Sequence, residues 1–340
     1  VIAACGILAF YAVLMGWTGH TLFHALLVGL PVDINAANTF FESISGGNSA
    51  LLGQLLSLVL TALVVGAGVQ GGIERLSRWS LPLLFLLLLI LSVWASTLPG
   101  AFEGYRDFLL RFEMQQLFSP TTIRYAFEQA FFSIGTGIGC ILAYAAYLDR
   151  RNHLPREAVA VVGMDTAVGL LAGMVTFPVV MSFGLKGLIN ESTVGTLFIA
   201  LPTGLSSLGT TGRLVAVLFF SLAYIAAITS SVSLLEVPVA SLMDRLGWSR
   251  TRAVWLSMGL IFVAGLPAVK YEAALDFMIS VFGGVLLVLG GLLLALLLGW
   301  VVPRRLDDDL ANCETPKGVR RWLRFMLRWV SPPVIAFGLI

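Results

Sequence analysis

Long apolar runs alternate with short polar stretches along almost the whole chain. Eight runs of 17 to 29 residues are predominantly hydrophobic, and the charged residues fall almost wholly between them. An α-helix rises about 1.5 Å per residue, so about 20 residues cross the roughly 30 Å of hydrocarbon in a bilayer. The pattern therefore predicts eight transmembrane helices and the start of a ninth near Val330. The eight runs are residues 2–30, 51–67, 81–98, 126–147, 158–184, 214–242, 253–269 and 274–302.

The composition excludes a soluble globular protein and makes the lipid bilayer an expected partner. Of the 340 residues, 58% are apolar and only 12% are charged, whereas charged residues make up about a quarter of a soluble chain. The formal net charge of +2 is too small to indicate a nucleic-acid partner. Cys5, Cys140 and Cys313 follow no ligand spacing, so we expect neither a disulfide framework nor a zinc site.

The basic residues predict the orientation in the membrane. Alternate connections lie on the same side, and those near 68–80, 148–157, 243–252 and 303–329 hold 15 of the 21 Lys and Arg residues. Basic loops remain in the cytoplasm, which places the other long connections, 31–50, 99–125 and 185–213, outside. We expect a multi-pass protein of the cell membrane. Because the chain starts in one apolar run and stops in another, we also expect that both ends are cut.

Three glycines interrupt the fourth run. Gly135, Gly137 and Gly139 lie within five residues, and each glycine costs a helix about 1 kcal/mol relative to alanine. Gly135 and Gly139 could form a G-x-x-x-G packing face, but Gly137 lies off that face. The spacing favours local unwinding, which lipid tolerates only where the freed N–H and C=O groups line a cavity and bind something.

A single ionisable residue, Asp165, lies in the fifth run. A carboxylate at the centre of a span costs roughly 2.5 to 3.5 kcal/mol, so it needs a partner. Sodium fits, because a hard cation takes oxygen ligands and Ser133 and Thr166 offer hydroxyls. A proton is the rival partner, and a carboxyl that only packs helices is a further alternative.

Small hydroxyl residues gather in the sixth run. Thr229 and Ser230, with the carbonyl of Ala226, could give three oxygens of a sodium cage, although such residues commonly bond only to their own helix. His20 and His24 have metal-ligand spacing, but no third ligand follows, so we interpret them as interface histidines. The sequence has no H-E-x-x-H motif, nucleophile elbow or paired carboxylates, which argues against an enzyme.

In order and spacing, six segments resemble the neurotransmitter:sodium symporter family, in particular its bacterial amino-acid transporters. They are Tyr11 with Gly16-Trp17, Gly72 with Pro82, Gln129 to Ser133 before the glycine break, Asp165, residues 195–202, and Phe219-Phe220 leading to Ala226 through Glu236.

The resemblance implies an all-α, inverted-repeat transporter fold of twelve helices with broken helices. On that register the chain runs from the third helix to the start of the eleventh, as one incomplete transporter domain, 1–340. Residues 1–98 would be the remainder of the first repeat, 126–302 the second repeat, and 303–340 a cytoplasmic loop and the start of a further helix. The family's first helix, which supplies half of the substrate site and ligands to both sodium ions, would be absent.

The resemblance also implies roles for the residues singled out above. Tyr11 would bond the substrate carboxylate, Phe132 would close the pocket as an aromatic lid, and Gly135 would enlarge the pocket. The implied substrate-binding residues are Ile7, Tyr11, Phe132, Ser133, Gly135, Ile138, Ser230 and Leu234. The implied sodium ligands are Ser133 and Asp165 in a first site, and Ala226, Thr229 and Ser230 in a second.

Three further expectations follow from the same resemblance. Many relatives have Asn in place of Asp165 and use chloride or a carboxylate one turn later, where this chain has Gly169, so chloride would not be required. Ile279 occupies the place of an outer-gate carboxylate, with Asp276 one turn away. Gly72 and Pro82 mark where the family's fifth helix can unwind at its inner end.

The resulting hypothesis is a sodium-coupled symporter that imports a neutral, hydrophobic amino acid by alternating access, with two sodium sites. The short connections favour a bacterial inner membrane. Two other hypotheses keep the same fold: an amino-acid sensor or structural membrane subunit that does not transport, and an inactive fragment.

Overall fold

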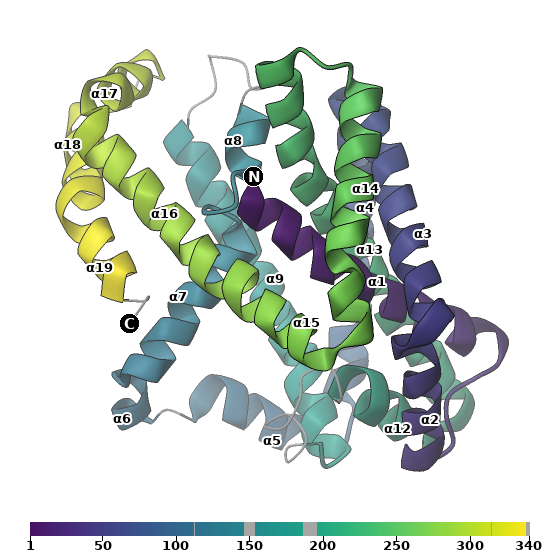
Figure 1. Ribbon diagram of the computed structural model, residues 1–340. Coiled ribbons are helices and arrows are strands. Elements are labelled where there is room, and N and C mark those ends of the chain that lie inside the picture. Colours follow the sequence, from purple (N-terminus) through teal and green to yellow (C-terminus); the bar gives the residue numbers. More distant parts are fainter. Residues whose placement is uncertain (112, 146–153, 186–195, 314, 338–340) are drawn as a thin grey trace.

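The computed structural model describes the chain except for residues 112, 146–153, 186–195, 314 and 338–340, and the described part is built of helices (Figure 1). Within it, seven helical stretches are long and apolar enough to cross a membrane, so seven of the eight predicted spans are confirmed as long helices. They are α1 (Ile2–Leu27), α3 (Gly47–Gly66), η1 (Val69–Glu74) with α4 (Arg75–Ser96), α9 (Leu154–Ser182), α13 (Gly209–Leu246), α14 (Arg250–Lys270), and the series α15 (Glu272–Met278), η4 (Ile279–Val285), α16 (Leu286–Leu296) and η5 (Leu297–Val301).

The remaining predicted span, 126–147, is two helices with a break between them. Helix α7 (Pro120–Ile134) begins six residues before the predicted start, and α8 (Cys140–Ala145) follows the break. Ser119 caps α7 by accepting the N–H of Thr122 at 3.2 Å, and Pro120 takes the first helical position, where its missing N–H costs nothing. Capping chemistry therefore starts this helix outside the apolar run from which the span was predicted.

The connections contain short helices that the apolar pattern did not predict. Those in the connections expected outside are α2 (Ile34–Ser45), α5 (Ala101–Tyr105), η2 (Arg106–Leu110), α6 (Met114–Leu117), η3 (Thr196–Ala200) and α12 (Leu201–Ser206). After the last long span come α17 (Pro303–Asn312), α18 (Lys317–Phe325), η6 (Met326–Val330) and α19 (Ser331–Phe337). The helix expected to begin near Val330 therefore already starts at Lys317, in the polar stretch before it.

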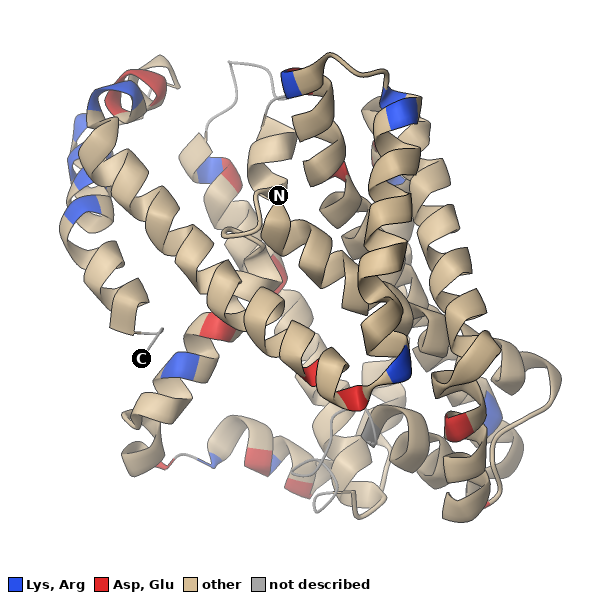
Figure 2. Cartoon of the chain, viewed as in Figure 1, with Lys and Arg blue, Asp and Glu red and all other residues tan. Residues whose placement is uncertain are grey.

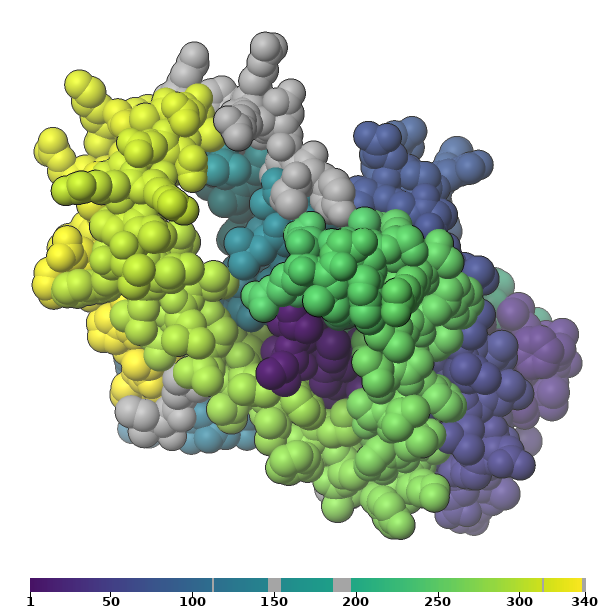
Figure 3. Space-filling model, turned by 45° about the horizontal axis from the view of Figure 1, so that its top comes forward, coloured from purple at the N-terminus to yellow at the C-terminus, as the bar shows by residue number. Residues whose placement is uncertain are grey.

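Helix α1 is the centre of the bundle and packs against α13, α3 and α14 (Figure 1). Lipid or protein can cover a helix that is apolar all round, and in α1 the cover is largely protein, since more than half of its residues are buried. In Figure 3 its first residues, in purple, lie in a hollow between the green and yellow-green helices. The backbones of α1 and α3 touch, because a Cβ on Gly16 would lie 2.6 Å from the carbonyl carbon of Gly53.

An aromatic cluster joins the outer connections to the bundle. The ring of Phe198 in η3 lies 6.0 Å from that of Trp17 in α1, 5.8 Å from Phe41 in α2 and 6.2 Å from Phe220 in α13. Such pairs contribute about 0.5 to 1.5 kcal/mol beyond the area they bury. The outer segment η3 is thereby fixed against the two helices that also line the site described next.

The charges are distributed unevenly between the two ends of the bundle. Lys and Arg gather at the end that holds α17, α18 and the turn between α13 and α14, whereas acidic residues are frequent at the opposite end (Figure 2). This is the end that the sequence predicts to face the cytoplasm.

Candidate substrate and ion site

The break between α7 and α8 is produced by its glycines. Gly135 ends α7 with a φ of +71°, and Gly139 has a φ of +94°, a region that residues with a Cβ rarely adopt. A Cβ on Gly137 would overlap the Leu287 carbonyl and lie 3.0 Å from the Gly291 nitrogen, so α16 approaches the break backbone to backbone. The predicted unwinding is confirmed, and Gly137 is explained by this close approach.

The break leaves polar backbone groups within a segment that the sequence predicts to cross the membrane. The last carbonyls of α7 and the first amides of α8 have no partner within their own helices, as at any helix end. The two half-helices thus present a partial negative and a partial positive charge to the same region. This supplies electrostatic recognition without additional buried side-chain charges.

A cavity of about 360 Å³ lies beside the break. Four elements contribute to its wall: α1, the inner end of α4, the α7–break–α8 segment and α13. All eight residues with an implied substrate role line it, which are Ile7, Tyr11, Phe132, Ser133, Gly135, Ile138, Ser230 and Leu234. The wall is largely apolar, with hydroxyl groups at a few points, as is typical of small-molecule sites.

Ser133 and Asp165 are brought together from two separate helices. The Ser133 hydroxyl donates a hydrogen bond to the Asp165 carboxylate, joining the end of α7 to the middle of α9. Thr166, by contrast, donates to the Val162 carbonyl of its own helix at 2.8 Å. Of the two hydroxyls considered for the first ion, only that of Ser133 lies at the carboxylate in this structure.

The hydroxyl residues of α13 form a second group of oxygens. Thr229 donates to the Ala226 carbonyl at 2.8 Å, and both Thr229 and Ser230 line the cavity. The Ser230 side chain also lies beside the Tyr11 hydroxyl. The described residues contain no group of three or more His, Cys, Asp or Glu suited to a metal, so a cation at this group would be held by carbonyl and hydroxyl oxygens, which alkali ions accept.

Several cavity residues were not predicted, and the most informative are Tyr144, Ser233 and Cys140. Tyr144 donates to the Ser233 hydroxyl at 2.8 Å, Ser233 donates to the Thr229 carbonyl at 3.1 Å, and the Cys140 thiol lies 3.4 Å from the Ser233 carbonyl. This chain of hydrogen bonds joins α8, which follows the break, to α13. Their sequence signal was the presence of polar groups inside apolar runs: Cys140 directly follows Gly139, and Ser233 lies one turn beyond Thr229.

A buried ion pair links the second half of α13 to the start of α14. Glu236 is fully buried, and its carboxylate accepts two hydrogen bonds from Arg250, one of them 3.2 Å long between Oε1 and Nη1. Arg250 also donates from Nε to the Val65 carbonyl at 2.7 Å. One guanidinium therefore joins α13, the start of α14 and the end of α3.

The other residues assigned by resemblance lie as follows. Gly72 is in the π-helical turn η1, and Pro82 is inside α4 without ending it. Ile279 begins η4, another π-helical turn, whereas Asp276 is exposed on α15. In that turn, a Cβ on Gly283 would lie 3.9 Å from the Phe132 ring.

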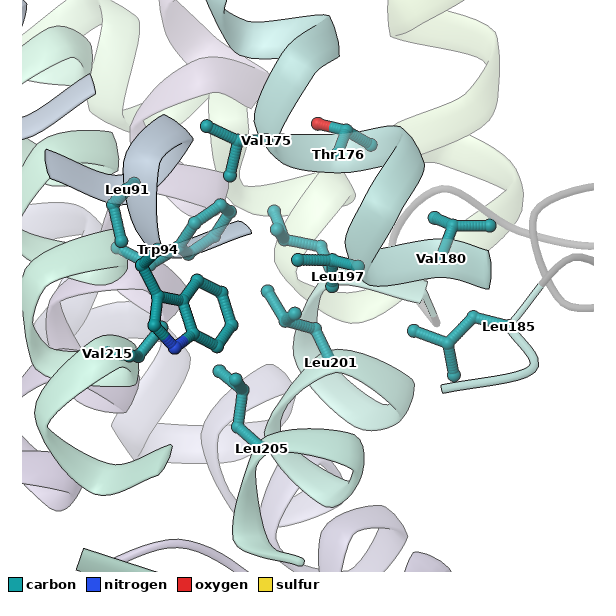
Figure 4. Close-up of a pocket in the computed structure, with 12 residues that line it drawn as sticks. Leu91, Trp94, Val175, Thr176, Val180, Leu185, Leu197, Leu201, Leu205 and Val215 are labelled. Carbon is teal, nitrogen blue, oxygen red and sulfur yellow. The ribbon is translucent and has the colours of Figure 1, made fainter. Parts of the chain in front are cut away.

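A second cavity, of about 240 Å³, lies toward the outer segments η3 and α12 (Figure 4). Its lining is almost wholly apolar, and the Thr176 hydroxyl donates to the Ala172 carbonyl of its own helix at 2.9 Å. It is lined by Leu91, Trp94, Val175, Thr176, Val179, Val180, Leu185, Leu197, Leu201, Leu205, Val215 and Phe219. Without converging polar groups it does not suit a charged solute, so the cavity at the break is the candidate site.

A multi-pass membrane protein with a glycine-broken helix, a cavity beside the break and oxygen groups around it has the architecture of a secondary transporter. The comparisons with known proteins agree with this class, because the relatives are sodium-dependent transporters and not enzymes.

The sequence profile of the family described as "Sodium:neurotransmitter symporter family" matches residues 42–340. An uncharacterized sodium-dependent transporter of Haemophilus influenzae is 28% identical over 98% of this chain and 76% of its own length, and YhdH of Bacillus subtilis is 38% identical over 78% and 58%. The crystal structure of MhsT in complex with L-phenylalanine superposes with a TM-score of 0.87 and 32% identity, covering 99% of this chain and 78% of MhsT. The chain belongs to the sodium:neurotransmitter symporter family, and its transport is therefore sodium-coupled.

Proposed function

We propose that this protein imports a neutral, apolar amino acid together with sodium by alternating access. The amino-acid carboxylate and amine would bind at the broken segment and Tyr11, and the apolar wall would receive the side chain. Phe132 would cover the bound substrate from outside. The Ser133 and Asp165 pair would hold one sodium ion, and the Ala226, Thr229 and Ser230 group a second.

One observation supports this proposal above the others. The ends of two half-helices, an apolar wall and two separate oxygen groups adjoin a single cavity of about 360 Å³. A zwitterion with an apolar side chain needs that combination, because its charged end and its hydrocarbon end require different surroundings. The similarity to MhsT, solved with L-phenylalanine bound, supports the same substrate class.

The carboxylate of Asp165 also bears on the anion requirement. In the described part of the chain, no basic residue forms an ion pair with Asp165. A sodium ion bound there would be compensated by a fixed negative charge, so we propose that transport needs no chloride. Gly169, one turn further along α9, offers no side chain for that purpose.

Uptake of labelled L-phenylalanine into proteoliposomes tests the proposal. We expect accumulation with an inward sodium gradient and none with potassium, and inhibition by unlabelled leucine but not by glutamate or lysine. Equal uptake in sodium and potassium would contradict sodium coupling. Substrate binding without uptake would favour a sensor of the same fold, and accumulation driven by a proton gradient alone would favour the proton as the partner of Asp165.

A further inference from the structure

The helical segment formed by α18 and η6, residues 317–330, combines basic and aromatic residues and contains no acidic residue. We call it the basic segment. Residues three, four or seven positions apart share a helix face. One face holds the basic residues Lys317, Arg321, Arg324 and Arg328, and a neighbouring face holds the aromatic residues Trp322, Phe325 and Trp329.

The aromatic face of the basic segment is not covered by the rest of the described chain. Trp322 is 57% exposed, Phe325 53% and Trp329 56%. In Figure 3 the yellow part of the chain, which includes this segment, lies at one edge of the molecule. Exposed tryptophans beside arginines are typical of the headgroup region of a bilayer, where the ring is partly in hydrocarbon and its N–H in a polar layer.

Contacts with the preceding span place the basic segment at the membrane boundary. Trp300, in the last turn of the span that ends at Val301, donates from Nε1 to the Arg328 carbonyl at 3.1 Å. The Arg328 guanidinium lies 4.4 Å over the Trp300 ring and 5.6 Å from the centre of the Trp329 ring. The segment therefore meets the end of the preceding span that is predicted to face the cytoplasm, where lipid phosphates would lie.

The guanidinium groups of the basic segment differ in whether the protein satisfies them. Arg324 is paired with Asp307, with Nε 3.1 Å from Oδ1. Arg320 and Arg328 each have a buried Nε for which the described part of the chain supplies no hydrogen-bond acceptor. Those two buried Nε atoms are closed to a ligand, but no Nη atom of Arg320 or Arg328 is both buried and without a partner. The outer Nη atoms therefore remain to bind a ligand, and a phosphate oxygen is the acceptor that arginine binds best.

We propose that the basic segment is a binding surface for anionic phospholipids of the cytoplasmic leaflet. Arg320, Arg321 and Arg328 donate to the lipid phosphate, while Trp322 and Trp329 lie at the boundary between headgroups and acyl chains. Clusters of four to eight basic residues directly beside a transmembrane helix attract such lipids, and each residue near the surface contributes about fivefold in binding. A free phosphate ion would satisfy the arginines but would leave the aromatic face exposed to water, so the lipid fits better.

Lipid retention measured by native mass spectrometry tests this proposal without requiring transport. The protein is released from nanodiscs made of equal parts phosphatidylglycerol and phosphatidylcholine, and the retained lipids are counted. We expect phosphatidylglycerol to predominate, and its preference to fall about tenfold or more in the triple variant R320Q/R321Q/R328Q. A matched control, R75Q/R78Q/R245Q, removes three charges elsewhere on the cytoplasmic side and should keep the preference.

Several results would overturn the proposal. They are equal retention of both lipids by the unchanged protein, an equal loss in both triple variants, and displacement of the lipid by millimolar inorganic phosphate. If the glutamine variant does not fold, the dependence on salt gives a second measurement on the unchanged protein. Raising the salt concentration from about 50 to about 500 mM should weaken the preference for phosphatidylglycerol. An unaltered preference would contradict recognition by charge. None of these outcomes bears on sodium-coupled uptake, so the two proposals fail separately.

Discussion

Replacing Asp165 with asparagine tests the proposed first sodium site most directly. The carboxylate accepts a hydrogen bond from Ser133 and has no basic partner in the described part of the chain. Holding such a charge inside the membrane costs roughly 2.5 to 3.5 kcal/mol. A bound sodium ion offsets that cost, whereas a neutral asparagine gains much less from the same ion.

The size of the effect follows from this cost. Loss of about 2.8 kcal/mol of compensation corresponds to about a 100-fold rise in the sodium concentration for half-maximal uptake, and this is an upper value. Ser133→Ala removes one neutral oxygen ligand, which contributes about 1 kcal/mol or about fivefold. We therefore expect D165N to lower the apparent sodium affinity clearly more than S133A does.

The assay is the initial rate of uptake against sodium concentration, with chloride or gluconate as anion at constant ionic strength. D165N should gain a chloride requirement, because an external anion can replace the missing charge. Thr166→Val is the matched control, since that hydroxyl is bonded to the Val162 carbonyl of its own helix. The reasoning fails if D165N has the same apparent sodium affinity and the same independence of chloride as the unchanged protein. It also fails if T166V lowers the apparent sodium affinity as much as S133A does.

Three further substitutions test the break, the inner ion pair and the lid. Gly137→Ala would force a Cβ into the backbone of α16, so radioligand binding should fall at least about tenfold. Unaltered binding would contradict the need for that close approach. Glu236→Ala removes the carboxylate from the largely buried Arg250, which keeps only the Val65 carbonyl, at a cost of up to about 3 to 5 kcal/mol. Tm should therefore fall by several degrees more than in Glu74→Ala, which breaks an exposed pair worth under about 1 kcal/mol. Phe132→Ala opens the cavity, so substrate should dissociate about ten times faster in a chase experiment, and an unchanged rate would remove its role as a lid.

The long spans and the break could be predicted from sequence because each depends on local chemistry. Apolar length specifies a span in any bilayer. Gly135 and Gly139 specify positive φ angles, which the structure has. The Asp165 carboxylate implied a partner on energetic grounds alone, and the structure brings Ser133 to it.

The missed features depend on contacts between distant segments or on capping. Hydropathy does not predict that Tyr144 meets Ser233, 89 residues away, because the register of α8 against α13 decides it. Short helices such as α2 have no long apolar run and begin at a cap, here the Asp33 carboxylate that accepts the Ala36 N–H at 2.8 Å. The position of Gly137 had a signal, but its cause is the approach of a helix about 150 residues later in the chain.

The elements around the cavity differ in regularity, and in the proposed cycle this difference would divide the site into a fixed and a movable side. Helices α1 and α13 are continuous, contact each other closely and are held at the outer end by the aromatic cluster around Phe198. On the other side, α4 follows the π-helical turn η1, and α7 is separated from α8 by the glycine break. Irregular turns can absorb a change of backbone angle without breaking a regular hydrogen-bond ladder, because that ladder is already interrupted there. In the proposed cycle the substrate would stay against α1 and α13 while α7 moves over it at the outer side and the inner end of α4 moves away from it.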